Sequence, residues 1–280
     1  MTDFINRAPD ELAHAKYSAM RERSDGLGVM GLHSYFQQKN IPFGSVMSKV
    51  WNKKIFKNIQ EKVDLASVSL AEERGACPDA AEYGMKERFS NKTAIAPTAS
   101  ISIICGGSSP GIEPIAANSY THKTLSGSFN VRNKYLKKIL QKHKKDTDDV
   151  WSTITTNQGS VARLDFLTPD EKDTFKTAFE IDQRWIVELG ADRTPHISQA
   201  QSINIFIPAD IHKKDLHQIH FQAWKKGLKS LYYCRSKSIQ RAENVNKGSS
   251  TDVTKNVYSQ GQESNNCLLY TSDAADDRIC

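Results

Sequence analysis

Apolar residues recur at helical spacing in the first quarter of the chain. Between positions 47 and 70 they return mostly every four residues, which predicts one long helix with a single apolar stripe formed by Met47, Trp51, Ile55, Ile59, Val63, Ala66 and Leu70. Gly75 is expected to end this helix, and Pro78 follows as a stop signal. The segment from Asp10 to Arg23, rich in Ala, Leu, Glu, Lys and Met, predicts an earlier helix.

Later segments alternate between helical and strand patterns. A short basic helix is expected from Asn133 to Lys145. Thr168-Pro169-Asp170-Glu171 predicts a capped helix start, and the helix that it opens is expected to bury Phe175, Phe179, Trp185 and Leu189 on or near one face. Polar and apolar residues alternate from Ser202 to Ile207, which predicts a strand. A helix from Asp210 to Gly227 and a strand from Leu228 to Cys234 follow.

Strands that alternate with helices of this length indicate β-α units and a parallel sheet, so we expect an α/β fold. From Ser236 to Asn266 the chain is polar and rich in Gln, Asn and Ser without periodicity, which predicts a flexible tail. Residues 267–280 resemble the in-frame translation of a transposon-end sequencing adapter. We therefore interpret them as an adapter-derived artefact and expect them to contribute no element of the fold.

Composition narrows the class of protein. The 280 residues are 38% hydrophobic and 25% charged, which is ordinary for a soluble globular protein. No apolar run approaches the roughly 20 residues needed to cross a bilayer, and no signal peptide is recognisable, so a cytoplasmic protein without a membrane partner is expected. The net charge of +6 is spread out and accompanies no nucleic-acid-binding module, so no nucleic-acid partner is expected.

Metal and disulfide chemistry is not indicated. None of the five cysteines forms a C-x-x-C pair, so neither a zinc site nor a disulfide framework is predicted. His217 and His220 stand three apart on a predicted helix without a further ligand and are interpreted as surface residues. Cys105 and Cys234 could each lie near a site, although an isolated cysteine is more often a small buried hydrophobe than a nucleophile. Glu113 has no visible partner in its Gly/Pro loop, and we assign it no role.

The segment from Ala94 to Pro114 carries the strongest chemical signal. A short apolar strand runs into a hydroxyl-rich turn that can open a helix, and backbone N–H groups at a helix start lack partners and favour an anion. Thr98 and Ser100 add hydroxyl donors. On spacing alone, however, a strand ending at Pro97 with Thr98 as an ordinary helix cap is the better interpretation.

The glycines from Gly26 to Gly31 match the dinucleotide-binding pattern G-x-G-x-x-G by letter. That pattern requires a preceding strand, whereas a helix is predicted here, so we interpret the segment as a helix-helix junction. An NAD-dependent oxidoreductase that uses this segment stays an alternative. A non-catalytic phosphate-binding module that uses Pro97 to Ile101 is another.

Four stretches in order resemble the large subunit of class I ribonucleotide reductase. They are residues 94–114, Gly127-Ser128-Phe129, residues 165–195 and residues 223–236. The resemblance covers about residues 3–245 and implies the C-terminal half of a ten-stranded α/β barrel, which is incomplete here. It implies a partial barrel domain over residues 1–240; polar composition predicts a flexible tail over 241–266, and the adapter-like segment occupies 267–280.

The resemblance also implies roles for particular residues. Pro97, Thr98, Ala99, Ser100 and Ile101 fall on the family's substrate-diphosphate loop, which grips phosphate largely through backbone amides. Tyr232 and Tyr233 fall on its adjacent tyrosine pair, which relays a radical from the small subunit. A phenol is protonated at neutral pH, so its oxidation must be coupled to loss of that proton. Tyrosine pairs are also common packing residues in strands.

The implied activity is the reduction of ribonucleoside diphosphates to deoxyribonucleoside diphosphates for DNA synthesis. The implied partners are a small subunit with a metal-radical cofactor, a second large subunit, and thioredoxin or glutaredoxin; ATP and deoxynucleotides are the implied effectors. The family's thiyl-forming and reducing cysteines have no counterpart here, because no Asn-x-Cys-x-Glu motif is present. We therefore expect a fragment that is inactive alone and binds no cofactor itself.

Overall fold

The computed structural model describes residues 5–124 and 127–236. The elements are η1 (Asp10–Leu12), α2 (Ala13–Glu22), α3 (Leu32–Gln38), α4 (Val46–Arg74), α5 (Pro78–Glu82), α6 (Ala99–Ile104), β1 (Ser119–Thr124), β2 (Gly127–Arg132), α7 (Lys134–Lys142), α8 (Asp148–Thr156), α9 (Pro169–Thr174), α10 (Gln183–Arg193), η2 (Thr194–His196), β3 (Ile205–Ile207), α11 (Lys213–Lys225) and β4 (Cys234–Ser236). Within these residues no helix is long and apolar enough to cross a bilayer. The expected tail and the adapter-like segment lie outside the described residues.

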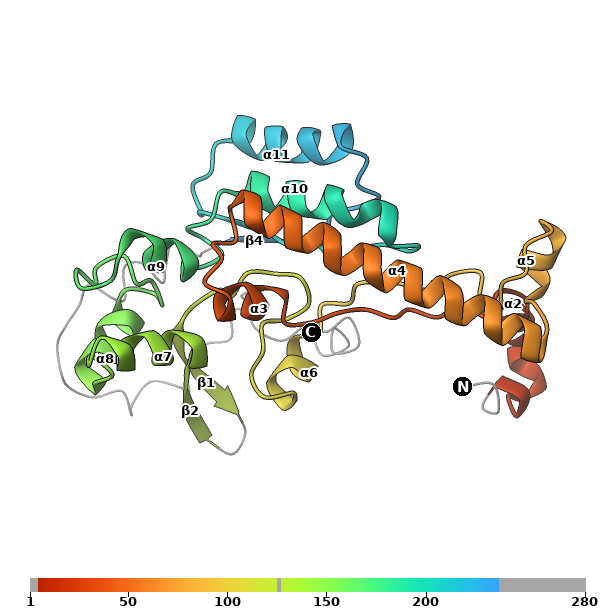
Figure 1. Ribbon diagram of the computed structural model, residues 1–280, viewed down its shortest axis with the longest axis horizontal. Helices are drawn as coiled ribbons and strands as arrows, with labels where there is room; N and C mark the ends of the chain where they lie inside the picture. Colours follow the sequence, from red (N-terminus) through yellow and green to blue (C-terminus); the bar gives the residue numbers. More distant parts are fainter. Residues whose placement is uncertain (1–4, 125–126, 237–280) are drawn as a thin grey trace, which may run out of the picture.

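Four extended segments lie side by side and run in the same direction. Leu27 pairs with Thr93, and Ile95 pairs with Gln201, each in an isolated parallel bridge. Just beyond Gln201, β3 pairs with β4 in a parallel ladder. Helices connect each segment to the next (Figure 1), so the predicted α/β class is confirmed as part of an α/β barrel. The expected total of ten strands in the complete barrel stays a prediction.

Helices α4, α10 and α11 form a layer over these segments, with α10 in the middle (Figure 1). Ile203, Ile205 and Ile207 belong to the buried core that includes this layer, and Ile203 packs closely against Gly190 of α10. Side chains alternate along a strand, so Asn204 and Phe206 point to the opposite face, where they line a cavity. Both faces of β3 are therefore buried, which the alternation of polar and apolar residues did not predict.

The long helix α4 is confirmed, but its buried stripe is rotated by one residue from the predicted one. Its buried residues are Ser48, Asn52, Phe56, Ser67 and Ala71, whereas the predicted apolar stripe is half-buried or exposed. The cause lies in α10, whose Arg193 is 1% exposed and donates to the Asn52 side chain at 3.0 Å. A buried guanidinium needs acceptors, so polar Asn52 faces the core.

The single helix expected from Thr168 past Leu189 is wrong, because the chain forms α9 and α10 with a break between them. Thr168 and Glu171 make the predicted capping box at the start of α9. After the break, the Asp182 side chain accepts from the backbone N–H of Arg184 and caps α10. The break lets Phe175 enter one core while Leu189 enters another.

The core that contains Phe175 is formed by α7, α8, α9 and the segments between them. Its fully buried members include Leu136, Trp151 and Phe175. The antiparallel hairpin of β1 and β2 leads into α7, whose start is capped by the Asn133 side chain. The residue pattern predicted α7 and the start of α9. It did not predict the hairpin or α8, because neither has a long apolar repeat.

The strand expected from Leu228 to Cys234 begins later, since β4 starts at Cys234. Backbone pairing with the segment that contains β3 begins at Tyr232, whose N–H donates to the Ile203 carbonyl at 2.8 Å. Residues 228–231 therefore connect α11 to the sheet, and the two tyrosines stand at the entrance to β4.

The Gly26 to Gly31 segment follows α2, not a strand, and joins it to α3, as interpreted from the sequence. A Cβ on Gly28 would lie 2.5 Å from the Ala94 carbonyl oxygen, so this glycine permits close pairing of two extended segments. Gly31 has φ of 82° at the N-cap of α3. Pairing and capping therefore account for both glycines without a dinucleotide.

We predict that Gly28→Ala destabilises the fold by about 1–3 kcal/mol, because its Cβ would force the paired segments apart. Gly26→Ala is the matched control, since its Cβ would meet the Ala94 side chain at 3.3 Å and demands a much smaller shift. Urea unfolding measures both. Equal losses of unfolding free energy in the two variants would contradict the close-approach argument.

Candidate functional site

The loop from Pro97 to Ile101 follows the second extended segment at its carboxyl end. Thr98 occupies the N-cap of α6 with φ of 52°, a left-handed conformation that β-branched residues rarely adopt. Its hydroxyl oxygen accepts from the backbone N–H of Gly111 at 2.7 Å and makes no cap bond to α6. Thr98 is therefore not the ordinary helix cap that spacing alone favoured.

The first turn of α6 presents backbone donors. No acceptor among the described residues takes a hydrogen bond from the amides of Ala99, Ser100 or Ile101. Ser100 and Ile101 are exposed. The Ser102 hydroxyl donates to the Ala99 carbonyl and is buried, so it belongs to the helix itself. The turn can thus offer N–H groups to a ligand.

Tyr232 and Tyr233 lie in ring contact at the start of β4. Their ring centroids are 4.1 Å apart with an interplanar angle of 53°. Tyr232 is 38% exposed, whereas Tyr233 is half-buried. The backbone N–H of Tyr233 donates to the Asn204 side chain at 3.0 Å, and the Tyr233 carbonyl accepts from Ile205 at 2.9 Å. The pair is therefore fixed to β3 through its backbone.

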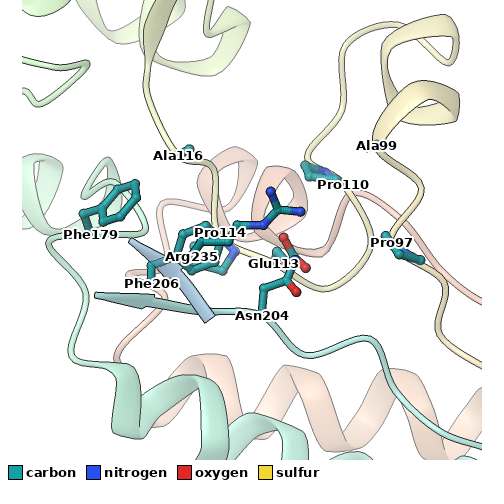
Figure 2. Close-up of a pocket in the computed structure, with 10 residues that line it drawn as sticks. All are labelled: Pro97, Ala99, Pro110, Glu113, Pro114, Ala116, Phe179, Asn204, Phe206 and Arg235. Atoms are coloured by element: carbon teal, nitrogen blue, oxygen red, sulfur yellow. The ribbon is translucent and has the colours of Figure 1, made fainter. Parts of the chain in front are cut away.

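A cavity of about 120 Å³ joins the loop to this strand pair (Figure 2). Pro97 and Ala99 line one side, and Arg235, two residues after Tyr233, lines another. Asn204, Phe206, Phe179, Glu113, Pro110, Pro114 and Ala116 complete the lining. The cavity lies toward the carboxyl ends of the parallel segments, the end at which α/β barrels carry their active sites.

Glu113 is the buried acidic residue of this cavity, although the sequence pattern assigns it no role. It is 7% exposed, and burial raises the pKa of its carboxyl from 4.5 to about 7, against a smaller lowering effect from Arg235. Among the described residues, its Oε1 and the Asn204 Nδ2 have no hydrogen-bond partner. The sequence did contain a signal for this residue, because an acidic side chain between Ile112 and Pro114 in a loop of Gly and Pro is unusual.

The other candidates do not join this site. Cys105 is exposed at the end of α6, and Cys234 is exposed on β4, where partial burial raises the pKa of its thiol. His217 stacks on Phe221, while the His220 ring contacts the Leu216 carbonyl. Within the described part of the chain, no three potential metal ligands cluster.

Comparison with known proteins identifies the family. The family described as the ribonucleotide reductase barrel domain matches residues 1–87 and 78–234. The chain belongs to this family. A solved structure of the class Id ribonucleotide reductase alpha subunit of Actinobacillus ureae superposes with a TM-score of 0.78 and 39% identity, covering 85% of this chain and 44% of that one. The cavity therefore lies in a domain that belongs to the reductase barrel family.

Curated relatives of this reductase barrel are ribonucleoside-diphosphate reductase large subunits. That of Invertebrate iridescent virus 6 is 47% identical over 249 residues, covering 88% of this chain and 26% of the relative. That of Caenorhabditis elegans is 33% identical over 271 residues, covering 85% and 34%. The chain thus spans about a quarter to a third of the length of these relatives.

We predict that Glu113 makes the stability of this reductase barrel pH-dependent. Its folded pKa is raised, so its contribution is fully present below pH 4.5 and is lost as pH rises toward 7. The full loss is about 3 kcal/mol. Glu113→Gln abolishes this dependence, as measured by urea unfolding from pH 4.5 to pH 8.

Glu72→Gln, an exposed carboxylate on α4, is the control and keeps the wild-type dependence. Parallel pH profiles for wild type and Glu113→Gln would show that the Glu113 carboxyl does not have a raised pKa in the fold.

Proposed function

We propose that this chain supplies part of the catalytic barrel of a ribonucleoside-diphosphate reductase large subunit, the enzyme class that makes deoxyribonucleoside diphosphates for DNA synthesis. The observation that carries the proposal is the shared cavity, which Pro97 and Ala99 of the loop and Arg235 of β4 line together. Membership of the reductase barrel family supports it independently. A substrate held at the loop would then lie near the strand that follows the tyrosine pair.

In this proposal the loop from Pro97 to Ile101 binds the substrate diphosphate. The amides of the first turn of α6 supply donors, and the positive end of the backbone dipoles favours an anion there. The Thr98 hydroxyl oxygen already accepts from Gly111, so its own proton is available to a phosphate oxygen. The apolar side chains of Ala99 and Ile101 do not interfere, because the backbone does the binding.

The tyrosine pair, in this proposal, carries a radical. A hydrogen-atom equivalent, one electron and one proton, leaves the phenol of one tyrosine and reduces the phenoxyl of the other to the phenol, so the radical moves by one residue. The ring separation of 4.1 Å makes that exchange short. The reverse exchange restores the pair after turnover, and neither residue is consumed.

The remaining parts of the reaction are proposals for the complete enzyme. They comprise the small subunit with its metal-radical cofactor, a second large subunit, thioredoxin or glutaredoxin, and ATP or deoxynucleotide effectors. We assign the thiyl-forming and reducing cysteines to the portion of the large subunit that this chain does not match. In that arrangement this chain contributes the diphosphate loop and the tyrosine pair of the radical relay.

For the loop, we predict that Thr98→Gly raises KM for ribonucleoside diphosphates by about tenfold through loss of the hydroxyl, while glycine tolerates the φ of 52°. Thr98→Ser retains the hydroxyl and is the matched control, with KM close to wild type. The assay uses a chimera in which residues 1–236 replace the matching segment of the Invertebrate iridescent virus 6 subunit. An unchanged KM in Thr98→Gly would show that the Thr98 hydroxyl does not contribute to substrate binding.

For the relay, we predict that Tyr232→Phe and Tyr233→Phe each reduce turnover of the same chimera to background, because phenylalanine has no phenolic proton and electron to exchange. Substrate binding stays intact in both variants. Tyr83→Phe is the control, since Tyr83 is 84% exposed at the end of α5 and does not line the cavity. Retained turnover in either test variant would reject the relay role of that tyrosine.

A further inference from the structure

Arg235 holds a positive charge against the ring of Tyr233. Tyr233 immediately precedes β4, and only Cys234 separates it from Arg235. Side chains two positions apart in an extended chain lie on the same face. The guanidinium carbon lies 5.6 Å from the Tyr233 ring centroid. A cation in this position is attracted to the ring and stabilises the phenolate relative to the phenol.

Glu113 opposes that charge from across the cavity. Figure 2 shows the Glu113 carboxyl and the Arg235 guanidinium pointing toward each other between the loop and the strands. They are the two ionisable side chains among the described residues that line the cavity. Their Coulombic interaction favours the ionised carboxylate, whereas burial disfavours it. Glu113 is therefore placed to counter the Arg235 charge.

Asn204 fixes the geometry of this group. Its side-chain oxygen accepts from the Tyr233 backbone, and the same side chain lines the cavity that holds Glu113. Asn204 is 1% exposed, so it has little freedom to move. The distance between Tyr233 and the Glu113–Arg235 pair is thus set by the β3 to β4 pairing and not by flexible surface side chains.

We propose that Glu113 and Arg235 are positioning residues for Tyr233: Arg235 favours release of the phenolic proton, and Glu113 limits that effect by opposing the Arg235 charge. The importance of this balance for catalysis rests on the proposed radical relay, in which Tyr233 must give up its proton when it is oxidised. The electrostatic effect itself does not depend on the relay.

The test is a site-resolved titration of Tyr233. We replace Tyr233 by 3-fluorotyrosine in the complete 280-residue chain, in a Tyr232→Phe background so that the neighbouring phenol does not titrate, and follow the fluorine resonance against pH. Arg235→Gln is expected to raise the pKa of the fluorotyrosine by about one unit. Glu113→Gln is expected to lower it by a smaller amount.

The double variant distinguishes an electrostatic role from a structural one. With Arg235 already replaced, Glu113→Gln should still lower the pKa by a similar amount, because the Coulombic effects of two separate charges on the phenolate add. Arg235→Lys should retain most of the wild-type value, since it keeps the charge. Glu72→Gln is the exposed-carboxylate control and should cause no shift.

Each outcome decides the proposal. An Arg235→Gln variant that titrates as wild type would overturn the role of Arg235, and an unshifted Glu113→Gln would overturn that of Glu113. If Arg235→Gln fails to fold, Arg235→Met, which keeps an unbranched stem and removes the charge, takes its place, and Glu113→Gln still tests the other charge. Turnover is not measured, so loss of the relay hypothesis and loss of this proposal would be seen in different experiments.

Discussion

The parallel pairing of four extended segments is the constraint on which the rest of this structure depends. Hydrogen bonds join the backbone around Leu27 to that around Thr93, Ile95 to the chain at Gln201, and β3 to β4. Parallel neighbours require helical crossovers, so the helices that connect the segments must return the chain to the same end each time. The loops that follow the segments consequently gather at one edge, where the cavity lies.

This pairing also dictates which polar groups are buried. Gln201 stands at the second bridge, and its side-chain oxygen accepts from the Nε of Arg193 at 2.7 Å. Burial lowers the pKa of Arg193 to about 9, so its guanidinium stays charged at neutral pH and needs the acceptors that Gln201 and Asn52 provide. A polar network thus sits between α4, α10 and the sheet. The same network turns α4 by one residue from its apolar stripe.

The parts of the fold that could be predicted are those governed by local chemistry. The capping box at Thr168, the glycine that ends α4 and the long repeat of α4 all act within a few residues, so the sequence reveals them directly. The break between α9 and α10 was not predicted, because Phe175 and Leu189 fit one helical face equally well. Their separation is decided by two different cores.

At the site, the hydroxyl-rich loop at Thr98, the tyrosine pair and their resemblance to a reductase could be recognised from the residues alone, because these are short motifs in a fixed order. The folded chain was needed to reveal that the loop shares a cavity with Arg235, that Thr98 is left-handed and that Glu113 is buried beside them. Glu113 and Arg235 are more than a hundred residues apart, and no local pattern encodes a contact made through the parallel pairing of strands. Burial and opposed charge are properties of the assembled cavity.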